Sequence, residues 1–382
     1  MTRLQAPFRA DHVGSFLRPQ ALIKAREAFQ AGKISRDELT AVEDQAIRDL
    51  VAKQKEVGLK NLTDGEFRRA YWHLDFFWGL NGISQSQAKT GYVFNSLVTK
   101  ADSATLTGKI SGENHPFVEH YKFLHQLADA KHVARQTIPA PAQLYFELIR
   151  DQEHLDNLYQ HYATKAELFA DLATAYRQVI DDLYAAGCRN LQLDDCTWGA
   201  IVDEQLLAHI AQDLNNGTTA QQLQQALKED FLTVNNLLLT QELPEDLVIN
   251  THICRGNFQS DWAAQGGYNA VADALFAKEN VDGYYLEFDT ERAGDFTPLA
   301  QVPQGKQVVL GLLTSKDPTL EDKELIKQRI QEASNYVPLE NLHLSCQCGF
   351  ASTQEGNKLS EQAQWDKIRL INEIVAEVWH KQ

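Results

Sequence analysis

Apolar residues recur along the chain at two spacings, which distinguish helices from strands. Seven segments carry apolar side chains at intervals of three and four residues, and several begin at a Ser, Thr or Asp that can cap a helix. The segments predict helices at Pro19–Gly32, Ser35–Val57, His161–Ala186, Thr219–Glu242, Asp261–Lys278, Leu320–Tyr336 and Ser360–His380. Short apolar runs between them predict strands at His12–Gly14, Asn61–Thr63, Val133–Ile138, Asn190–Leu193, Leu247–Asn250, Gly283–Leu286, Gln307–Gly311 and Leu342–Ser345.

Strands that alternate with helices indicate parallel βαβ units. Eight such runs in one chain of this length favour a closed (β/α)8 TIM barrel over an open doubly wound sheet. Asn81–Gly112 does not fit a minimal barrel, because it is rich in Gly, Ser, Thr and Asn around a short apolar core. It predicts a hairpin inserted between the second and third strands. With no Pro-rich linker or internal repeat in the sequence, we expect residues 1–382 to form a single catalytic barrel domain.

Composition and charge exclude several classes of protein. The 382 residues are 43% apolar, enough for a large core, and carry a formal charge of −16. This charge argues against nucleic acid or an anionic membrane as a partner. Apolar runs such as Val308–Leu313 are too short to span a bilayer, and Met1–Phe16 has no apolar signal region, so we expect a cytoplasmic protein. Five cysteines fit free or metal-bound thiols better than a disulfide framework.

Reactive side chains follow three of the predicted strands. In a (β/α)8 barrel, active residues stand at the carboxyl ends of the strands. His252 and Cys254 follow the fifth run and share one face of an extended segment, Glu287 follows the sixth, and Cys348 follows the eighth. One imidazole, two thiolates and a carboxylate suit Zn²⁺ in tetrahedral geometry. The sequence therefore predicts a zinc site at these four residues.

Each of these residues also has an ordinary structural interpretation. His252 and Cys254 could be a packed pair, Glu287 an ion-pair carboxylate, and Cys348 a small buried apolar residue. Cys346 competes with Cys348 as the last ligand, although its side chain could equally face the barrel interior or the helices. The coincidence at three strand ends, and the position of Cys348 beside a glycine, favour the metal site with Cys348.

The ligand set also indicates a reaction type. Hydrolytic zinc sites usually keep neutral, His-rich ligands, so that the metal strongly acidifies water. Two thiolates and a carboxylate bring three negative charges to the ion, which makes it a weaker Lewis acid. Such a site is better suited to hold a substrate thiol as an electron-rich thiolate. The predicted chemistry is alkyl transfer to sulfur.

At these residues the sequence resembles the cobalamin-independent methionine synthase family, and specifically its carboxyl-terminal catalytic barrel. The similar stretches run through most of the chain: Val13-Gly14-Ser15-Phe16, Asp64-Gly65-Glu66, Leu193-Asp194-Asp195, Thr251-His252-Ile253-Cys254, Leu286-Glu287 and Cys348-Gly349. The resemblance implies that homocysteine sulfur approaches a zinc ion held by the four residues above. It further implies that Gly14 and Ser15 hold the amino acid's carboxylate, and that Glu66 and Asp194 bind its ammonium group.

The chain departs from the family in two ways that bear on the methyl donor. Full-length members carry a second, amino-terminal barrel that helps to hold the polyglutamylated folate, so a separate partner protein could be needed to supply the donor. The family also places a histidine after the seventh strand as proton donor, where this chain has Lys316 and Asp317. Aromatic residues that could stack on a pterin, or simply pack at the barrel mouth, are Trp72, Tyr145, Phe146 and Trp198.

Three functions fit the sequence. The leading hypothesis is a zinc-dependent enzyme that forms methionine by methyl transfer from 5-methyltetrahydrofolate, as a polyglutamate, to homocysteine. A second is a zinc-thiolate alkyltransferase with another small thiol or methyl donor; Glu66 and Asp194 argue for an amino-acid thiol. A third is a non-catalytic zinc-binding protein, whose metal site would be closed.

Overall fold

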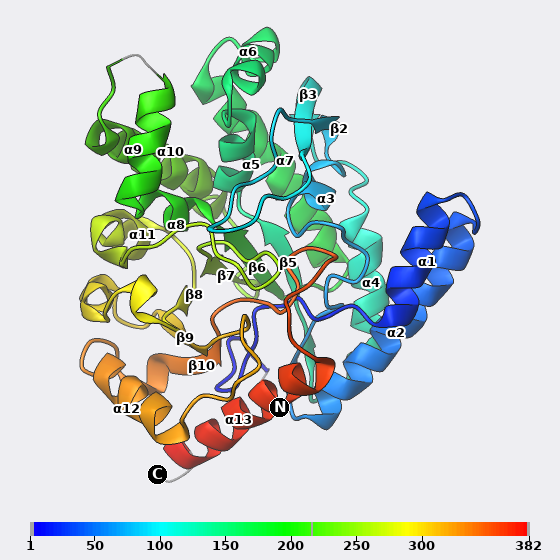
Figure 1. Cartoon of the computed structure of the whole chain (residues 1–382), viewed down its shortest axis with the longest axis vertical. Helices are drawn as coiled ribbons and strands as arrows, with labels where there is room; N and C mark the ends of the chain where they lie inside the picture. The colour runs from blue at the N-terminus through cyan, green and yellow to red at the C-terminus, as the bar shows by residue number, and fades with distance from the viewer. Residues whose placement is uncertain (1–3, 215–216, 380–382) are drawn as a thin grey trace.

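A ring of parallel strands forms the centre of the molecule (Figure 1). The computed structural model describes residues 4–214 and 217–379. Six strands pair in chain order, each parallel to the next. They are β5 (Gln136–Pro139), β6 (Asn190–Asp195), β7 (Val248–Ile253), β8 (Gly283–Glu287), β9 (Gln307–Leu313) and β10 (Leu342–Cys346). The pair β1 (Asn61–Leu62) and β4 (Val133–Ala134) is also parallel, and β4 leads directly into β5.

The first predicted strand closes the ring. Ala10 makes a parallel bridge to Leu344 of β10, and Ser15 makes one to Gly65, just after β1. Backbone hydrogen bonds flank both bridges: Asp11 N–H donates to Leu344 O at 3.0 Å, and Phe16 N–H donates to Gly65 O at 3.2 Å. Residues 10–16 therefore lie between β10 and β1, and the predicted (β/α)8 barrel is confirmed.

Helices surround the strands (Figure 1), and the buried apolar residues of these helices belong to one hydrophobic core. Local capping explains several starts; Ser35 and Glu38, for example, form a reciprocal capping box at the start of α2. The helices are α1 (Gln20–Gln30), α2 (Arg36–Glu56), α3 (Leu74–Phe77), α4 (Phe117–Leu127), α5 (Pro141–Leu148), α6 (Gln152–His161), α7 (Lys165–Ala185), α8 (Thr197–Ile201), α9 (Glu204–Leu214), α10 (Ala220–Leu239), α11 (Ala272–Lys278), α12 (Lys323–Ala333) and α13 (Glu361–Trp379). Within the described part of the chain, each helix is too short or too polar to cross a membrane.

The predicted helix over Asp261–Lys278 is wrong in its first half. Only Ala272–Lys278 is α-helical (α11), with a short 3₁₀ turn at Tyr268–Ala270 before it. Gly266 has a φ of +132°, which is far from helical values, and a side chain there would lie 2.5 Å from the carbonyl oxygen of Val202. The segment before α11 is therefore a loop that packs over the end of the barrel.

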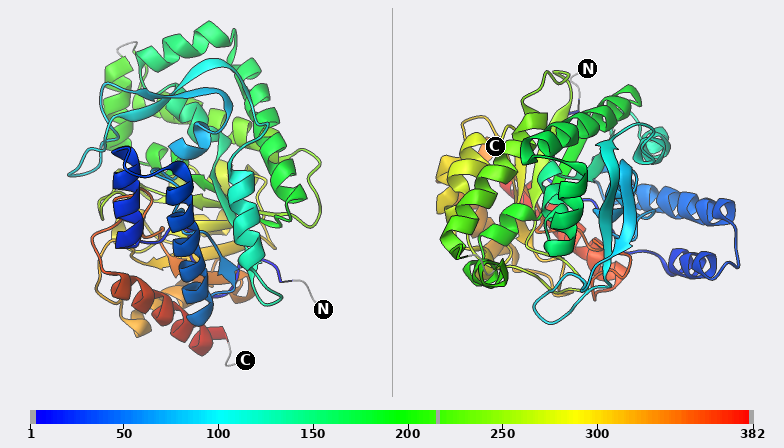
Figure 2. Two further views of the ribbon diagram at one scale, coloured as in Figure 1. Left: turned by 90° about the vertical axis from the view of Figure 1, so that its right-hand side faces the viewer. Right: turned by 90° about the horizontal axis from the view of Figure 1, so that it is seen from above.

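The inserted hairpin is confirmed and lies over the carboxyl ends of the strands. β2 (Asn81–Gln87) pairs antiparallel with β3 (Asp102–Ser111), between β1 and β4 in the chain. In the left view of Figure 2 it lies across the upper part of the molecule, above α1 and α2. Its connecting loop, residues 88–101, reaches the loop after β7, where Asn95 N–H donates to Trp262 O at 2.8 Å and the Phe94 and Phe258 rings lie 5.3 Å apart. The loop thus covers part of the site-bearing face.

Candidate metal centre and adjoining cavity

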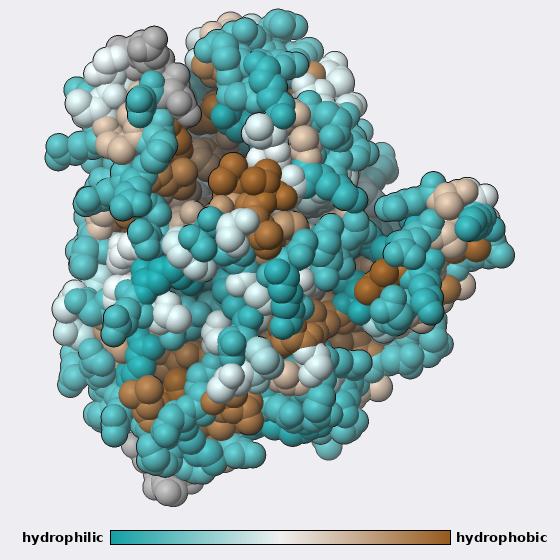
Figure 3. All heavy atoms as spheres, viewed as in Figure 1, coloured by the Kyte–Doolittle hydropathy of each residue, from teal (hydrophilic) through white to brown (hydrophobic). Residues whose placement is uncertain are grey.

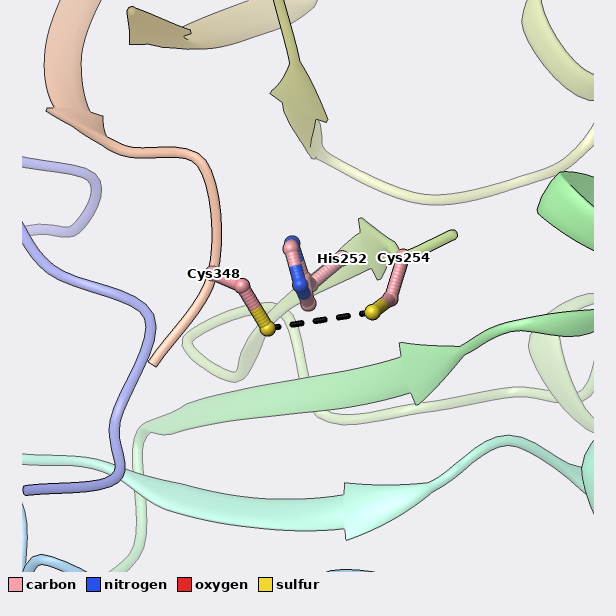
Figure 4. Close-up of side chains that lie close together, drawn as sticks. All are labelled: His252, Cys254 and Cys348. Atoms are coloured by element: carbon pink, nitrogen blue, oxygen red, sulfur yellow. Dashed lines mark hydrogen bonds between the residues drawn. The ribbon is translucent and has the colours of Figure 1, made fainter. Parts of the chain in front are cut away.

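Three potential metal ligands meet at the carboxyl ends of the strands (Figure 4). His252 lies on β7, Cys254 follows this strand, and Cys348 follows β10. Their ligand atoms all lie within 4.8 Å of one another, and the two sulfur atoms are 3.7 Å apart. All three side chains are buried. Alternation along the extended chain points His252 and Cys254 to one side, as the spacing predicts.

The geometry of this cluster fits a tetrahedral zinc ion. Two sulfur atoms bound to zinc at about 2.3 Å in a tetrahedral arrangement are about 3.8 Å apart, close to the observed separation. The ring of His252 lies with Nδ1 at 3.2 Å from the carbonyl oxygen of Tyr285, which must receive an N–H from it. Nε2 therefore carries the lone pair, and it has no hydrogen-bond partner among the described residues. A histidine oriented in this way by a backbone carbonyl is typical of a metal ligand.

The thiols need a cation in order to ionise. A hydrogen bond with Cys254 raises the pKa of Cys348 well above its ordinary value, and burial raises it further. The pKa of Cys254 is raised in the same way, chiefly by a hydrogen bond with Cys196. Two buried thiolates side by side repel each other, and a bound divalent ion removes that repulsion.

Glu287, the fourth predicted ligand, lies at the end of β8 beside the cluster but is not among the three clustered residues. It is fully buried. Its Oε2 accepts a hydrogen bond from Arg255 N–H at 3.0 Å, while Oε1 has no partner among the described residues. Its negative charge helps to raise the pKa of Cys254. One free carboxylate oxygen beside the thiols leaves Glu287 able to complete the ligand set.

The structure distinguishes the two cysteines at the end of β10. Cys348 is in the cluster, whereas Cys346 belongs to the hydrophobic core and lies near the charges of Glu321 and Lys367, toward the outer helices. The loop that carries Cys348 is held in place because Gly349 lies very close to Ser15. A side chain at Gly349 would place its Cβ 1.9 Å from Ser15 Oγ, so only glycine fits there without movement.

A cavity of about 330 Å³ opens beside the cluster and is lined by all three of its residues. Of the predicted homocysteine-binding residues, Ser15, Glu66 and Asp194 line it. Gly14 supports the loop instead, with a φ of +142° and its carbonyl accepting a hydrogen bond from Thr63. Most of the face seen in Figure 3 is hydrophilic, and hydrophobic residues gather in several patches, in its lower half as well as in its upper half.

Two buried carboxylates, Glu66 and Asp194, lie in the cavity wall. Burial raises the pKa of Glu66 to about 7, an increase that Arg69 opposes and Asp194 reinforces. Burial likewise raises the pKa of Asp194 to about 7. Glu66 Oε2 has no hydrogen-bond partner among the described residues. Its backbone φ of +61°, uncommon for a residue with a side chain, is typical of functional positions. A cationic group bound between these carboxylates would offset the free-energy cost of burying their negative charges.

The other predicted residues divide between the cavity and the core. Trp72 and Phe146 line the cavity. Tyr145 and Trp198 are instead buried against Phe231, and the hydroxyl of Tyr145 donates to Asp230. The structure therefore brings two of the four aromatic candidates to the site.

Neither proton-donor candidate lines the cavity. Lys316 Nζ lies 3.2 Å from Asn257 Oδ1, and Asn257 is a lining residue. Asp317 is exposed and accepts a hydrogen bond from Thr319 N–H at 2.8 Å. Hydrogen bonds from Thr319 hold the pKa of Asp317 below its usual value. Asp317 therefore lacks the raised pKa that a general acid would need.

Sequence reasoning missed two cavity residues next to the thiols. Cys196 follows β6, lines the cavity and shares a hydrogen bond with Cys254. The rule that located the other ligands, a reactive side chain after a strand, applies equally to Cys196. Ser352, whose Oγ lies 3.8 Å from Cys348 Sγ, is on an irregular loop that carries no comparable signal.

Comparison with known proteins agrees with this geometry. The family model described as the cobalamin-independent synthase catalytic domain matches residues 8–363. The Bacillus subtilis protein YxjG, which is uncharacterised, is 43% identical over 99% of this chain and 97% of its own length. A Listeria monocytogenes structure, solved as a candidate vitamin-B12 independent methionine synthase, is 41% identical with a TM-score of 0.75 and covers 99% of both chains.

A more distant structure has the same fold. It is that of a B12-independent methionine synthase from Shewanella sp. W3-18-1 in complex with selenomethionine, 20% identical, with a TM-score of 0.67 over 98% of both chains. The family match spans most of the barrel strands, the clustered thiols and the cavity. The chain thus belongs to the cobalamin-independent synthase catalytic-domain family and is a methionine synthase-like methyltransferase.

Proposed function

We propose that the protein forms methionine by zinc-dependent methyl transfer from 5-methyltetrahydrofolate, as a polyglutamate, to the thiol of homocysteine. One observation carries the proposal. Two thiols and an imidazole gather beside a cavity whose wall also holds two buried carboxylates, Glu66 and Asp194. This combination suits a ligand that has a thiol at one end and a cationic amine at the other.

His252, Cys254, Glu287 and Cys348 are the residues that would hold the zinc ion. A zinc ion there would supply the positive charge that keeps the homocysteine sulfur ionised and nucleophilic at neutral pH. The residues around the ligands fix their orientation. The carbonyl of Tyr285 holds the His252 ring, and the backbone N–H of Arg255 holds the Glu287 carboxylate.

The opposite end of homocysteine would bind to the loops after the first two predicted strands and to the end of β6, which carries Asp194. Glu66 and Asp194 receive the ammonium group in charge-assisted hydrogen bonds, which exclude thiols that lack an amine. Ser15 and the backbone of its loop receive the carboxylate. Ser15 is held in place because its Oγ accepts a hydrogen bond from Ala351 N–H at 3.3 Å and its carbonyl accepts one from Phe350 N–H at 2.9 Å.

The methyl donor would enter beneath the loop of residues 88–101, which contributes Tyr92, Val93 and Phe94 to the cavity wall. Trp72 and Phe146 offer aromatic surfaces for a flat ring. Covering this region with the hairpin loop excludes water from the reacting groups. Lys316, through its contact with Asn257, is the candidate for delivering a proton to the leaving nitrogen.

The Michaelis constant for homocysteine is expected to rise as the pH falls through about 7. Burial raises the pKa of Glu66 to about 7 in the ligand-free protein, and only the ionised carboxylate attracts the ammonium group. Below the raised pKa, proton binding competes with homocysteine; above it, the carboxylate is ready to bind. Steady-state kinetics between pH 5.5 and 8.5, which we choose to bracket the pKa of about 7, measure this dependence. A Michaelis constant for homocysteine that does not change over this pH range would contradict the assignment of Glu66 to the ammonium group.

A methyl-transfer assay tests the function directly. Purified zinc-loaded protein is given homocysteine with 5-methyltetrahydrofolate monoglutamate, its triglutamate or methylcobalamin in parallel, and methionine is measured. Methionine from the folates, with more from the triglutamate, is the expected result. Methionine from methylcobalamin alone would replace the proposed donor, and no methionine from any donor despite bound zinc would reject the proposed reaction.

A further inference from the structure

A buried histidine outside the metal cluster forms part of the cavity wall. His73 is 4% exposed and lines the cavity together with its neighbour Trp72. Its Nε2 lies 2.9 Å from the hydroxyl oxygen of Tyr92, a residue of the hairpin loop. Its Nδ1 has no hydrogen-bond partner among the described residues. Because an unpaired buried polar atom costs about 1–3 kcal/mol, one at a cavity wall points to a ligand that would pair with it.

The hydrogen bonds around His73 determine which ring nitrogen carries the proton. The hydroxyl of Tyr92 donates to Glu147 Oε2 at 2.8 Å. Glu147 also receives hydrogen bonds from the Ser103 hydroxyl and, at 3.1 Å, from the Arg150 guanidinium, so its carboxylate acts only as an acceptor. The single proton of the Tyr92 hydroxyl is thus directed to Glu147. The Tyr92 oxygen must accept from His73, which places the histidine proton on Nε2.

His73 therefore presents an acceptor at Nδ1. Burial lowers the pKa of His73 to about 4, although the charge of Glu147 opposes this change, so the ring is neutral at physiological pH. A neutral imidazole protonated at Nε2 has a lone pair on Nδ1. The ring can accept a hydrogen bond there but cannot donate one.

The position of His73 relates it to the methyl donor rather than to homocysteine. A chain of contacts leads outward from the metal cluster: Cys348 Sγ lies 3.8 Å from Ser352 Oγ, and Ser352 O accepts a hydrogen bond from Trp72 N–H at 2.9 Å. The Trp72 ring in turn lies 4.6 Å from the His73 ring. His73 is thus farther along the chain of contacts from the thiols than Trp72, and it is linked to the hairpin loop through Tyr92.

We propose that His73 binds the methyl donor by accepting a hydrogen bond at Nδ1 from an N–H or O–H group of that molecule. Tyr92 and Glu147 are positioning residues that keep the proton on Nε2. The inference rests on the proposed methyl-transfer function and narrows its substrate class. The donor carries an N–H or O–H group close to the flat surface that stacks beside Trp72, as the pterin of a folate does.

Kinetics of three variants test the role of this acceptor. His73→Phe removes the acceptor while keeping an aromatic ring, and it is expected to raise the Michaelis constant for 5-methyltetrahydrofolate about tenfold, the effect of losing one hydrogen bond to a buried donor. The constant for homocysteine is expected to stay within about twofold. His73→Asn, whose side-chain oxygen lies near the place of Nδ1, is expected to raise the Michaelis constant for 5-methyltetrahydrofolate less than His73→Phe does. Tyr92→Phe is also expected to raise this constant less than His73→Phe does.

A matched control separates recognition from loss of a buried histidine. His343 is 5% exposed on β10, and its Nε2 bonds to Gln307 at the start of β9, the end of the barrel remote from the cluster. His343→Phe is expected to leave the constant for the donor unchanged. The proposal would be overturned if His343→Phe raised the Michaelis constant for the donor as much as His73→Phe does. It would also be overturned if His73→Phe left this constant unchanged.

Nitrogen-15 NMR of histidine-labelled protein tests the same proposal without turnover. The chain has 12 histidines, and comparison with His73→Phe identifies the signal of His73. We expect an unprotonated Nδ1 in the free protein, and a shift of this nitrogen on addition of 5-methyltetrahydrofolate but not of homocysteine. A proton on Nδ1 would overturn the inference whether or not the protein forms methionine. Absence of methionine from folate, with Nδ1 unprotonated, would reject the proposed donor and leave the acceptor role supported.

Discussion

Cys348→Ser is expected to lower the affinity for zinc at least about a hundredfold and to reduce methionine formation below detection. Structural zinc sites bind with about 10–16 kcal/mol, so each of four ligands contributes about 3 kcal/mol, and a serine hydroxyl is a poor substitute for a thiolate. The Cys348 sulfur lies 3.7 Å from that of Cys254, so its loss also removes one of the hydrogen-bond partners of the second thiol. Zinc content after dialysis against a chelator, and methionine production, measure the two effects.

Cys346→Ser provides the matched control for this change. Cys346 is two residues away and equally buried, but it packs in the hydrophobic core near Glu321 and Lys367 rather than in the cluster. The variant should lose some stability, because a hydroxyl replaces a thiol in an apolar environment, while it keeps its zinc. If Cys346→Ser lost zinc and Cys348→Ser retained it, the assignment of the ligand on this loop would be wrong.

Glu66→Gln is expected to raise the Michaelis constant for homocysteine about a hundredfold. Removing one partner of a buried charge pair costs about 3 kcal/mol, and a factor of ten corresponds to about 1.4 kcal/mol. Glu66 lines the cavity with one carboxylate oxygen unpaired, and its amide replacement keeps the shape but not the charge. The dependence of the constant on pH should also become flatter, because the titrating group is gone.

Glu279→Gln is the control for burial of a glutamate. Burial raises the pKa of Glu279 to about 8, and its carboxylate lies near Asp195 and Asn235, but it does not line the cavity. Replacing it should change stability without changing the constant for homocysteine. Equal constants for wild type and Glu66→Gln would show that Glu66 does not bind the ammonium group.

The barrel was predictable because its strands are short, apolar and regularly alternated with amphipathic helices. Every predicted strand lies in the ring, although the first is joined to its neighbours only by isolated bridges at Ala10 and Ser15. Helices with strong local signals, such as α2 with its capping box at Ser35, were also predicted. These predictions were possible because the same pattern, a short apolar strand followed by an amphipathic helix, repeats along the chain.

The missed elements are ones that local pattern does not specify. α5 (Pro141–Leu148) is buried along almost its whole length and so lacks an amphipathic signal. α8 (Thr197–Ile201) is a single turn stabilised by its surroundings. Asp261 has a capping-type side chain, but it bonds to Ser96 of the hairpin loop rather than starting a helix. Long-range contacts decide these segments, and a sequence shows them only indirectly.

The same distinction holds for the site. The thiols and imidazole follow strands, so the barrel topology was sufficient to predict that they meet. His73 and Tyr92 come from the segment after β1 and from the inserted hairpin, whose placement over the cavity no local pattern gives. Tyr145 and Phe146 are adjacent in the sequence, but the turn of α5 sends the first into the core and the second to the cavity.

X-ray absorption at the zinc edge, with and without homocysteine, tests the central claim most directly. If homocysteine sulfur binds the zinc ion held by His252, Cys254, Glu287 and Cys348 as an additional or exchanging ligand, the free protein has two zinc–sulfur contacts at about 2.3 Å and gains a third when homocysteine is added. Glu66→Gln should require a much higher homocysteine concentration for the same change. An unchanged spectrum at saturating homocysteine would contradict the account, because it would show a closed, structural zinc site.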